Sequence, residues 1–277
     1  MIAGRVIAGF CLAMLASTAI AAERPVEGAP SSIGGAAAGC LQGGVPLPAE
    51  GRGWQVLRPD NNRYWGTPAL IGFLEDFGKY AAPMGSLLIG DMSLPRGGQM
   101  PTGHASHQTG LDADILFQLA NHPLTEQERD HPDFTSVLVK GKPTPARWGK
   151  AQATLLKMAA TDPRVERIFV NPAIKRYLCR TAGSDREWLH AIRPWWGHEA
   201  HFHVRLRCME GDSRCEPGPF IPAGDGCDAS LAWWFTPEAG ATAETTPPPH
   251  GPRPRIVAKT PDACKAILDP KSLDDAS

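Results

Sequence analysis

The sequence predicts an α+β fold in which a small antiparallel sheet carries polar side chains on one face and helices pack on the other. Residues 201–207 and 111–115 both alternate polar and apolar residues with the two-residue period of a β-strand. Apolar residues at helical spacing over 67–82 predict a helix that covers the apolar sheet face. Several cysteines predict disulfides that staple this domain.

The remaining elements are expected in order along the chain. Residues 86–92 are typical of a buried strand, and the turn-rich residues 95–107 of a loop that delivers side chains to a site. Residues 121–148 are polar and irregular, which suggests a flap. We expect a helix at 149–160, a strand at 165–170 that Asn171-Pro172 ends, and short helices at 173–179 and 186–192.

The length of the chain and the composition of its two terminal segments predict one catalytic domain with extended ends. Residues 1–21 are typical of a secretory signal, with an apolar run before an Ala19-Ile20-Ala21 cleavage motif. The run is too short and too rich in alanine to favour a permanent transmembrane helix. We therefore expect a catalytic domain over residues 22–236 and a Pro-rich extended tail over 237–277.

Charge excludes one class of partner. The 28 Lys and Arg residues nearly balance 29 Asp and Glu, and no basic run or basic-aromatic patch occurs. Such a chain has no strong attraction to nucleic acid, so none is expected as a partner. The oligomeric state is left open, a homodimer included.

Removing the predicted signal leaves six cysteines, an even number that favours three disulfides in an exported protein. Cys208 and Cys215 flank a short turn and are expected to close a small loop. Cys40 and Cys264 lie near opposite ends, could tie these together and would pin the tail. No CxxC pair occurs, which disfavours a zinc site built from cysteines.

Histidines and aspartates on the two predicted strands indicate a metal site. His201 and His203 project from one strand face, roughly 6–7 Å apart at their Cα atoms. Asp112 and Asp114 alternate on the second strand, and His107 precedes Asp114 by seven residues. His107, Asp114 and His203 supply the ligand mix of catalytic zinc sites, in which a fourth position is left for water. His201 is then free to act as a general base.

Other polar and aromatic residues of the chain are expected to have less direct roles than the three ligands and the base. Asp112 could replace Asp114 as a ligand, but its closer spacing to His107 favours a supporting role. Arg205 and Arg207 share the histidine face, where they could pair with Asp112 or bind a substrate carboxylate. The Trp195-Trp196 pair is interpreted as core. No role is expected for the isolated histidines His122, His131, His190 and His250.

Three motifs, at residues 103–114, 168–175 and 198–206, resemble the penicillin-insensitive murein endopeptidases. These belong to the wider group of lysostaphin-like and D-Ala-D-Ala metallopeptidases. The resemblance runs from about Cys40 to Cys264. It implies a periplasmic zinc enzyme that cuts the D-alanyl to meso-diaminopimelyl cross-link of peptidoglycan.

The resemblance also implies roles for individual residues. His107, Asp114 and His203 match the zinc ligands, His201 the catalytic histidine, and His198 a further active-site histidine. The cysteines match a family pattern of three pairs: Cys40–Cys264, Cys179–Cys227 and Cys208–Cys215.

The resemblance raises two points about this chain, a second metal and the role of Asp112. A second metal is implied, with His104 as one ligand and Asp130, His131 and Asp133 as loop candidates. The wider group often has alanine near the ligand aspartate where this chain has Asp112, so this residue is interpreted as a feature of the endopeptidase branch.

Two other functions compete with the endopeptidase. One is a D,D-carboxypeptidase or dipeptidase on the same zinc site, and the other a non-catalytic module that binds the cell wall. The loop at 121–148 and the three motifs favour the endopeptidase, and a binding module has no need for His201. The expected mechanism uses no serine nucleophile, so β-lactams should not inhibit it whereas chelators should.

Overall fold

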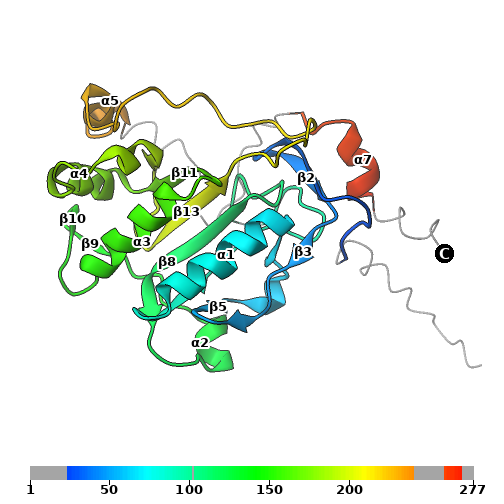
Figure 1. The fold of residues 1–277 in the computed structure, drawn as a ribbon, viewed down its shortest axis with the longest axis horizontal. Helices are drawn as coiled ribbons and strands as arrows, with labels where there is room; N and C mark the ends of the chain where they lie inside the picture. Colours follow the sequence, from blue (N-terminus) through cyan, green and yellow to red (C-terminus); the bar gives the residue numbers. More distant parts are fainter. Residues whose placement is uncertain (1–23, 102, 240–258, 270–277) are drawn as a thin grey trace, which may run out of the picture.

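A computed structural model describes residues 24–101, 103–239 and 259–269. The predicted signal at 1–21 and much of the predicted tail lie outside these ranges. The centre is a sheet of seven strands: β4 (Glu50–Gly51), β5 (Trp54–Val56), β7 (Ser86–Ile89), β8 (Asp112–Ala120), β11 (Val165–Val170), β12 (Ile192–Pro194) and β13 (His201–Leu206). Their order is β12-β11-β13-β8-β7-β5-β4, with the long strands β8 and β13 in the middle (Figure 1).

The α+β class is confirmed, but the prediction of a small antiparallel sheet was wrong. The sheet is mixed, because β5 pairs with β7 and β11 with β12 in parallel. Strands β4, β5 and β12 contain only two or three residues. Segments this short show no alternation, so their sequence carries no strand signal.

The pairing of β8 with β13 decides which side chains share a face. Asp114 lies opposite His203 and Asp112 opposite Arg205, whereas Ile115 lies opposite Phe202. Directly opposed residues in an antiparallel pair point to the same side of the sheet. One face therefore collects the polar residues of both strands.

Helices cover the apolar face, as predicted. Helix α1 (Pro68–Ala81) begins where the Thr67 side chain accepts a hydrogen bond from the backbone N–H of Leu70, and proline occupies its first turn. Its Phe77 ring meets Phe202 edge-on at 6.5 Å. Helix α3 (Lys150–Thr161) lies beside it and adds buried leucines to the same core (Figure 1).

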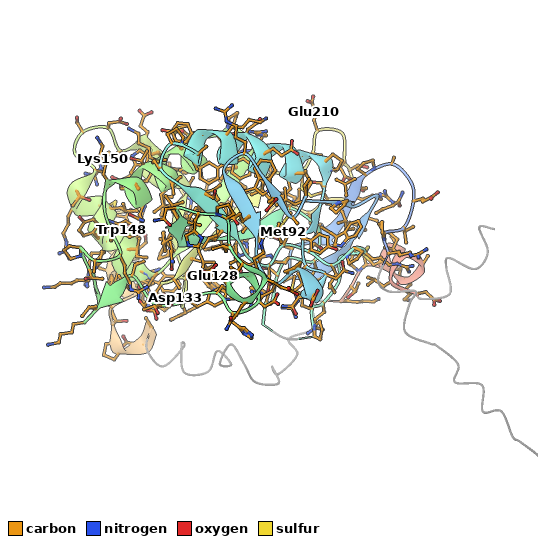
Figure 2. The ribbon with its side chains drawn as sticks, turned by 90° about the horizontal axis from the view of Figure 1, so that it is seen from below. Met92, Glu128, Asp133, Trp148, Lys150 and Glu210 are labelled. Carbon is orange, nitrogen blue, oxygen red and sulfur yellow. A yellow bond between two sulfur atoms is a disulfide. The ribbon has the colours of Figure 1, made fainter. Side chains whose placement is uncertain are left out.

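Met92 is fully buried near the middle of Figure 2, whereas the exposed Glu210 projects from the surface.

Smaller elements complete the chain. They are β1 (Ser31–Gly35), β2 (Ala38–Gln42), β3 (Val45–Pro46), η2 (Pro59–Asn61), β6 (Trp65–Gly66), α2 (Glu126–Asp130), β9 (Leu138–Val139), β10 (Lys142–Pro143), α4 (Pro172–Thr181), η3 (Glu187–Ala191), α5 (Ala229–Trp233) and α7 (Ala263–Leu268). The predicted flap at 121–148 thus holds a short helix and a small hairpin. The segment expected as a helix over 186–192 is a 3-10 helix that runs into β12.

Three disulfides form, and each pair is the one implied by the resemblance. Cys40 and Cys264 are fully buried and join α7 to β2 across 224 residues. Disulfides are typical of exported proteins. Within the described ranges, no helix is both long and apolar enough to cross a membrane.

Candidate metal centre

Three segments bring the candidate residues together on the polar sheet face. Asp114 comes from β8, and His201 and His203 come from β13. His104 and His107 lie in the loop between β7 and β8. Gln108 holds this loop against the first hairpin, since its side-chain amide donates to the Ala37 carbonyl at 2.8 Å and accepts from the Gly39 N–H. His107 itself has a left-handed backbone with φ of 68°.

The carboxylate of Asp114 lies at the centre of the cluster. Its Oδ1 is 3.2 Å from His203 Nδ1 and 3.5 Å from His107 Nε2. Its Oδ2 is 3.2 Å from His104 Nδ1 and 3.6 Å from His201 Nε2. The structure therefore brings together the three predicted ligands, the predicted base and His104.

Burial divides the cluster into a floor and a rim. The floor consists of His107, which is fully buried, and of Asp114 and His203, whose side chains are 6% and 5% exposed. His104 and His201 keep 22% and 23% of their side-chain surface exposed. A substrate that approaches from solvent would therefore meet these two histidines first.

The electrostatics of the floor favour an ionised Asp114 and a neutral His107. By contrast, burial of His203 is outweighed by the carboxylates of Asp112 and Asp114, which raise the pKa of this histidine in the metal-free protein. Burial by itself raises the pKa of Asp114, but the surrounding histidines, His201 first, outweigh it and hold that pKa well below its ordinary value. Burial lowers the pKa of His107 to about 4, so its ring is neutral at pH 7. A neutral ring leaves a nitrogen lone pair available for a metal.

Two further carboxylates contact the outer nitrogens of His203 and His104, those that face away from Asp114. Asp112 Oδ1 lies 2.7 Å from His203 Nε2 and 2.6 Å from Arg205 Nε. Burial raises the pKa of Asp112, but Arg205 and His203 more than offset it, so the carboxylate is ionised and accepts both bonds. The supporting role expected for Asp112 agrees with this geometry.

Asp91 contacts the outer nitrogen of His104 as Asp112 contacts that of His203, and this residue was not predicted from the sequence. Its Oδ2 lies 2.8 Å from His104 Nε2, and its carboxylate also accepts from Arg58 and Arg63. Although burial opposes charge, His104 and the two arginines lower the pKa of Asp91 to about 2. The available signal was an aspartate two residues after the end of the buried strand β7, without a histidine close to it in the sequence.

The buried polar atoms fit a metal ion. Neither ring nitrogen of His107 nor Oδ1 of Asp114 has a hydrogen-bond partner among the described residues. Leaving such atoms unsatisfied is costly, which favours a ligand there. One potential ligand atom each from His104, His107 and Asp114 lies within 4.8 Å of the others. Imidazole and carboxylate donors together suit zinc and similar divalent metals.

The loop candidates for a second metal do not assemble in the same way. Within the described ranges, the group of three potential ligands whose atoms all lie within 4.8 Å of one another is His104, His107 and Asp114, and His203 adjoins it through Asp114 Oδ1 at 3.2 Å. Asp133 instead accepts hydrogen bonds from Thr135 and Arg147, which both belong to the predicted flap at 121–148. His104 thus lies with the predicted first site and not in a separate one.

His198 lies beside His201, with ring centroids 5.0 Å apart. Its Nδ1 is 2.8 Å from the Trp196 carbonyl, and its backbone is left-handed with φ of 48°. Asn171 fixes this turn, since its backbone N–H donates to the His198 carbonyl at 2.9 Å. Burial lowers the pKa of His198 to about 3 and also lowers that of His201, so both rings are neutral at pH 7.

The remaining predicted residues have other partners. Arg205 pairs with Asp112, while Arg207 donates to the Pro163 carbonyl. His122 and His190 contact backbone carbonyls of Pro123 and Gly224, and His250 lies outside the described residues. The interpretation of Trp195 as core was wrong, because 45% of this residue is exposed.

Comparisons with known proteins agree with the motifs. A model of the family described as penicillin-insensitive murein endopeptidase matches residues 32–269. A protein of that name from Yersinia enterocolitica is 45% identical over 251 residues, covering 88% of each chain. Another from Salmonella typhi is 45% identical over 252 residues, again with 88% of each chain covered. Nothing in these matches or in the described residues supports a homodimer.

Proposed function

Because this chain belongs to the penicillin-insensitive murein endopeptidases, we propose that it is a periplasmic zinc enzyme that hydrolyses D-alanyl to meso-diaminopimelyl cross-links of peptidoglycan. The observation that carries the zinc assignment is the convergence of imidazole nitrogens on the buried Asp114 carboxylate. The carboxypeptidase and wall-binding alternatives receive no support from the names of the relatives.

His107, Asp114 and His203 are the proposed zinc ligands, and His104 Nδ1 is close enough to Asp114 to contribute to the same site. Asp112 and Asp91 fix the outer nitrogens of His203 and His104, so the Nδ1 atoms point inward. When bound, zinc polarises the scissile carbonyl and lowers the pKa of water to about 7.

His201 is the proposed general base and acid. It is neutral at pH 7 because partial burial lowers its pKa, and the part of its side chain that remains exposed lets it reach the substrate. It takes a proton from the attacking water and later gives a proton to the diaminopimelyl amine as the peptide bond breaks.

His198 has a role that follows from its hydrogen bond. The Trp196 carbonyl can only accept, so Nδ1 of His198 carries the proton and Nε2 of the neutral ring presents a lone pair. We therefore assign His198 to accept a hydrogen bond, from the substrate amide N–H or from water. In this protonation state it has no free N–H to offer an oxyanion.

The test is digestion of dimeric, cross-linked muropeptides by purified mature protein, resolved by liquid chromatography and mass spectrometry. We expect conversion of dimers to monomers that a chelator abolishes, zinc restores and a β-lactam leaves unchanged. Release of terminal D-alanine from monomers, with dimers intact, would indicate the carboxypeptidase. Intact substrate in a zinc-loaded sample would indicate a binding role.

A further inference from the structure

Four of the eight tryptophans form one cluster at the end of the sheet that carries β12. Trp195 and Trp196 directly follow β12, and Trp233 and Trp234 lie at the end of α5. The ring centroids of Trp196 and Trp234 are 4.6 Å apart, and those of Trp195 and Trp233 lie 5.1 and 6.4 Å from that of Trp196. We call these four residues the indole cluster.

Two members of the indole cluster face solvent, and the other two are partly buried. Trp195 is 45% and Trp233 41% exposed, whereas Trp54, Trp148 and Trp188 are buried in the core. Large aromatic side chains with an apolar face and a polar N–H are enriched where proteins bind partners. Exposed apolar surface of this kind indicates an interaction site.

The indole cluster is continuous with the metal centre. Phe169 of β11 lies between them, with its ring 5.3 Å from His203 and 5.7 Å from Trp195. The His198 ring lies 6.1 Å from Phe169 on the same side. A ligand in the metal centre could therefore extend onto the indoles without leaving the surface.

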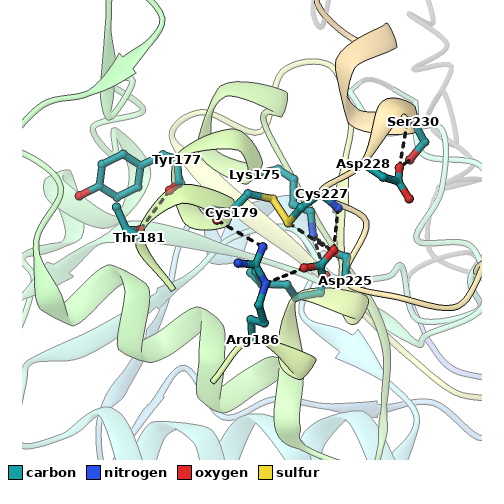
Figure 3. Close-up of a disulfide and its surroundings, with 10 residues drawn as sticks. Lys175, Tyr177, Cys179, Thr181, Arg186, Asp225, Cys227, Asp228 and Ser230 are labelled. Carbon is teal, nitrogen blue, oxygen red and sulfur yellow. Dashed lines mark hydrogen bonds and ion pairs between the residues drawn. A yellow bond between two sulfur atoms is a disulfide. The ribbon is translucent and has the colours of Figure 1, made fainter. Parts of the chain in front are cut away.

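The segment that carries Trp233 and Trp234 is fastened in place. Figure 3 shows the disulfide between Cys179 of α4 and Cys227, next to the paired Arg186 and Asp225 side chains. The fully buried Lys175 donates to the backbone carbonyls of Asp225 and Leu189. These links join the segment to α4 and η3. The cluster is thus held ready for a ligand, which lowers the entropic cost of binding.

We propose that the indole cluster binds the glycan strand of peptidoglycan while its peptide cross-link occupies the metal centre. This inference rests on the proposed function. The carbon-bound hydrogens of a pyranose ring form an apolar face that suits an exposed indole, and the indole N–H suits sugar hydroxyls. The peptide stem is acidic and would instead be recognised by cations, which the four indoles do not supply.

The geometry suits this assignment. Successive ring centroids from His203 through Phe169 and Trp195 to Trp196 are 5.3, 5.7 and 5.1 Å apart. A stem of about four residues between cross-link and glycan spans at most roughly 13–14 Å when extended. The steps from His203 to Phe169 and on to Trp195 are together shorter than such a stem, so the stem can reach the first indole while the cross-link lies in the metal centre.

The experiment measures binding and cleavage separately. Binding of the zinc-loaded protein to glycan strands stripped of their peptides is measured by calorimetry. Cleavage is measured on cross-linked dimers with and without their sugars. The variant is Trp195→Ala/Trp233→Ala, with Trp233→Leu as a milder change. Tyr80→Ala is the matched control, because Tyr80 of α1 is 41% exposed and lies on a helix that covers the opposite sheet face.

We expect the double variant to bind stripped glycan at least about tenfold more weakly. Its KM should rise for sugar-bearing dimers, with kcat unchanged and sugar-free dimers cleaved as before. Tyr80→Ala should match the wild type. Thermal unfolding shows whether each variant is folded, and Trp233→Leu provides the comparison if the double variant is not.

Three outcomes would overturn the glycan assignment. The first is a wild-type protein that does not bind stripped glycan, and the second is variants that bind it as tightly as the wild type does. The third, a loss of cleavage on sugar-free dimers equal to that on sugar-bearing dimers, would assign the indoles to the peptide. Glycan binding by a protein that cleaves no dimer would instead reject the proposed function and retain the glycan site.

Discussion

Asp112 lies 2.7 Å from His203 Nε2, on the side of the imidazole that faces away from Asp114. The ionised carboxylate accepts from Nε2–H, so in the neutral ring, the form that binds a metal, Nδ1 carries the lone pair and faces the metal centre. The adjacent Arg205, at 2.6 Å, keeps Asp112 charged although it is fully buried. Asp112 and Arg205 together thus set the tautomer of His203, one of the proposed ligands.

Asp112→Asn should weaken zinc binding by about 10- to 100-fold, because the amide no longer fixes His203 as a charged acceptor does. Competition with a chromophoric chelator measures the affinity directly. Asp228→Asn is the control, since this exposed aspartate caps α5. An unchanged zinc affinity in a folded Asp112→Asn protein would contradict the orienting role.

His201→Ala should lower turnover by about 10²–10⁴-fold while zinc remains bound, because the variant loses the proposed base and not a ligand. Turnover on dimeric muropeptides and zinc content are measured on the same sample. His190→Ala is the control, because His190 contacts a loop carbonyl outside the cluster. Wild-type turnover in His201→Ala would remove this residue from the mechanism.

The local patterns predicted the parts of the fold that carry a strong period. Alternation identified β13, and the helical spacing of apolar residues identified α1. The short strands β4, β5 and β12 owe their conformation to neighbours in the sheet, so no local pattern could reveal them or the parallel pairing of β5 with β7 and of β12 with β11.

The site was predicted where its residues share a strand or a motif. His203 and Asp114 could be paired because both lie on alternating segments. Asp91 could not be assigned, because its bond to His104 crosses thirteen positions of turn-rich loop. Trp195 was misread as core because its exposure depends on where β12 ends at the sheet edge, which a sequence pattern does not encode.

Acid should destabilise the metal-free protein through His107. Folding lowers the pKa of this histidine from 6.5 to about 4, so the unfolded chain binds more protons between these values. The free energy of unfolding therefore rises with pH over this window and is lost on acidification, by on the order of 3 kcal/mol.

Chemical denaturation at several pH values between 4 and 7, with wild type and His107→Gln compared, measures this contribution. Glutamine does not titrate in this range, so its stability curve should be flatter. Parallel curves for the two proteins would show that His107 is not the group responsible.

The disulfides should differ in their contribution to stability according to the loops they close. Cys40–Cys264 spans 224 residues and Cys208–Cys215 only 7. In the chain-entropy account, replacing the first pair by alanines costs roughly 5 kcal/mol of unfolding free energy, and replacing the second about 2 to 3 kcal/mol. Chemical denaturation of both double variants without metal gives the comparison. An equal or larger loss for the short loop would mean that native contacts of Cys208–Cys215, and not restriction of the unfolded chain, determine the effect.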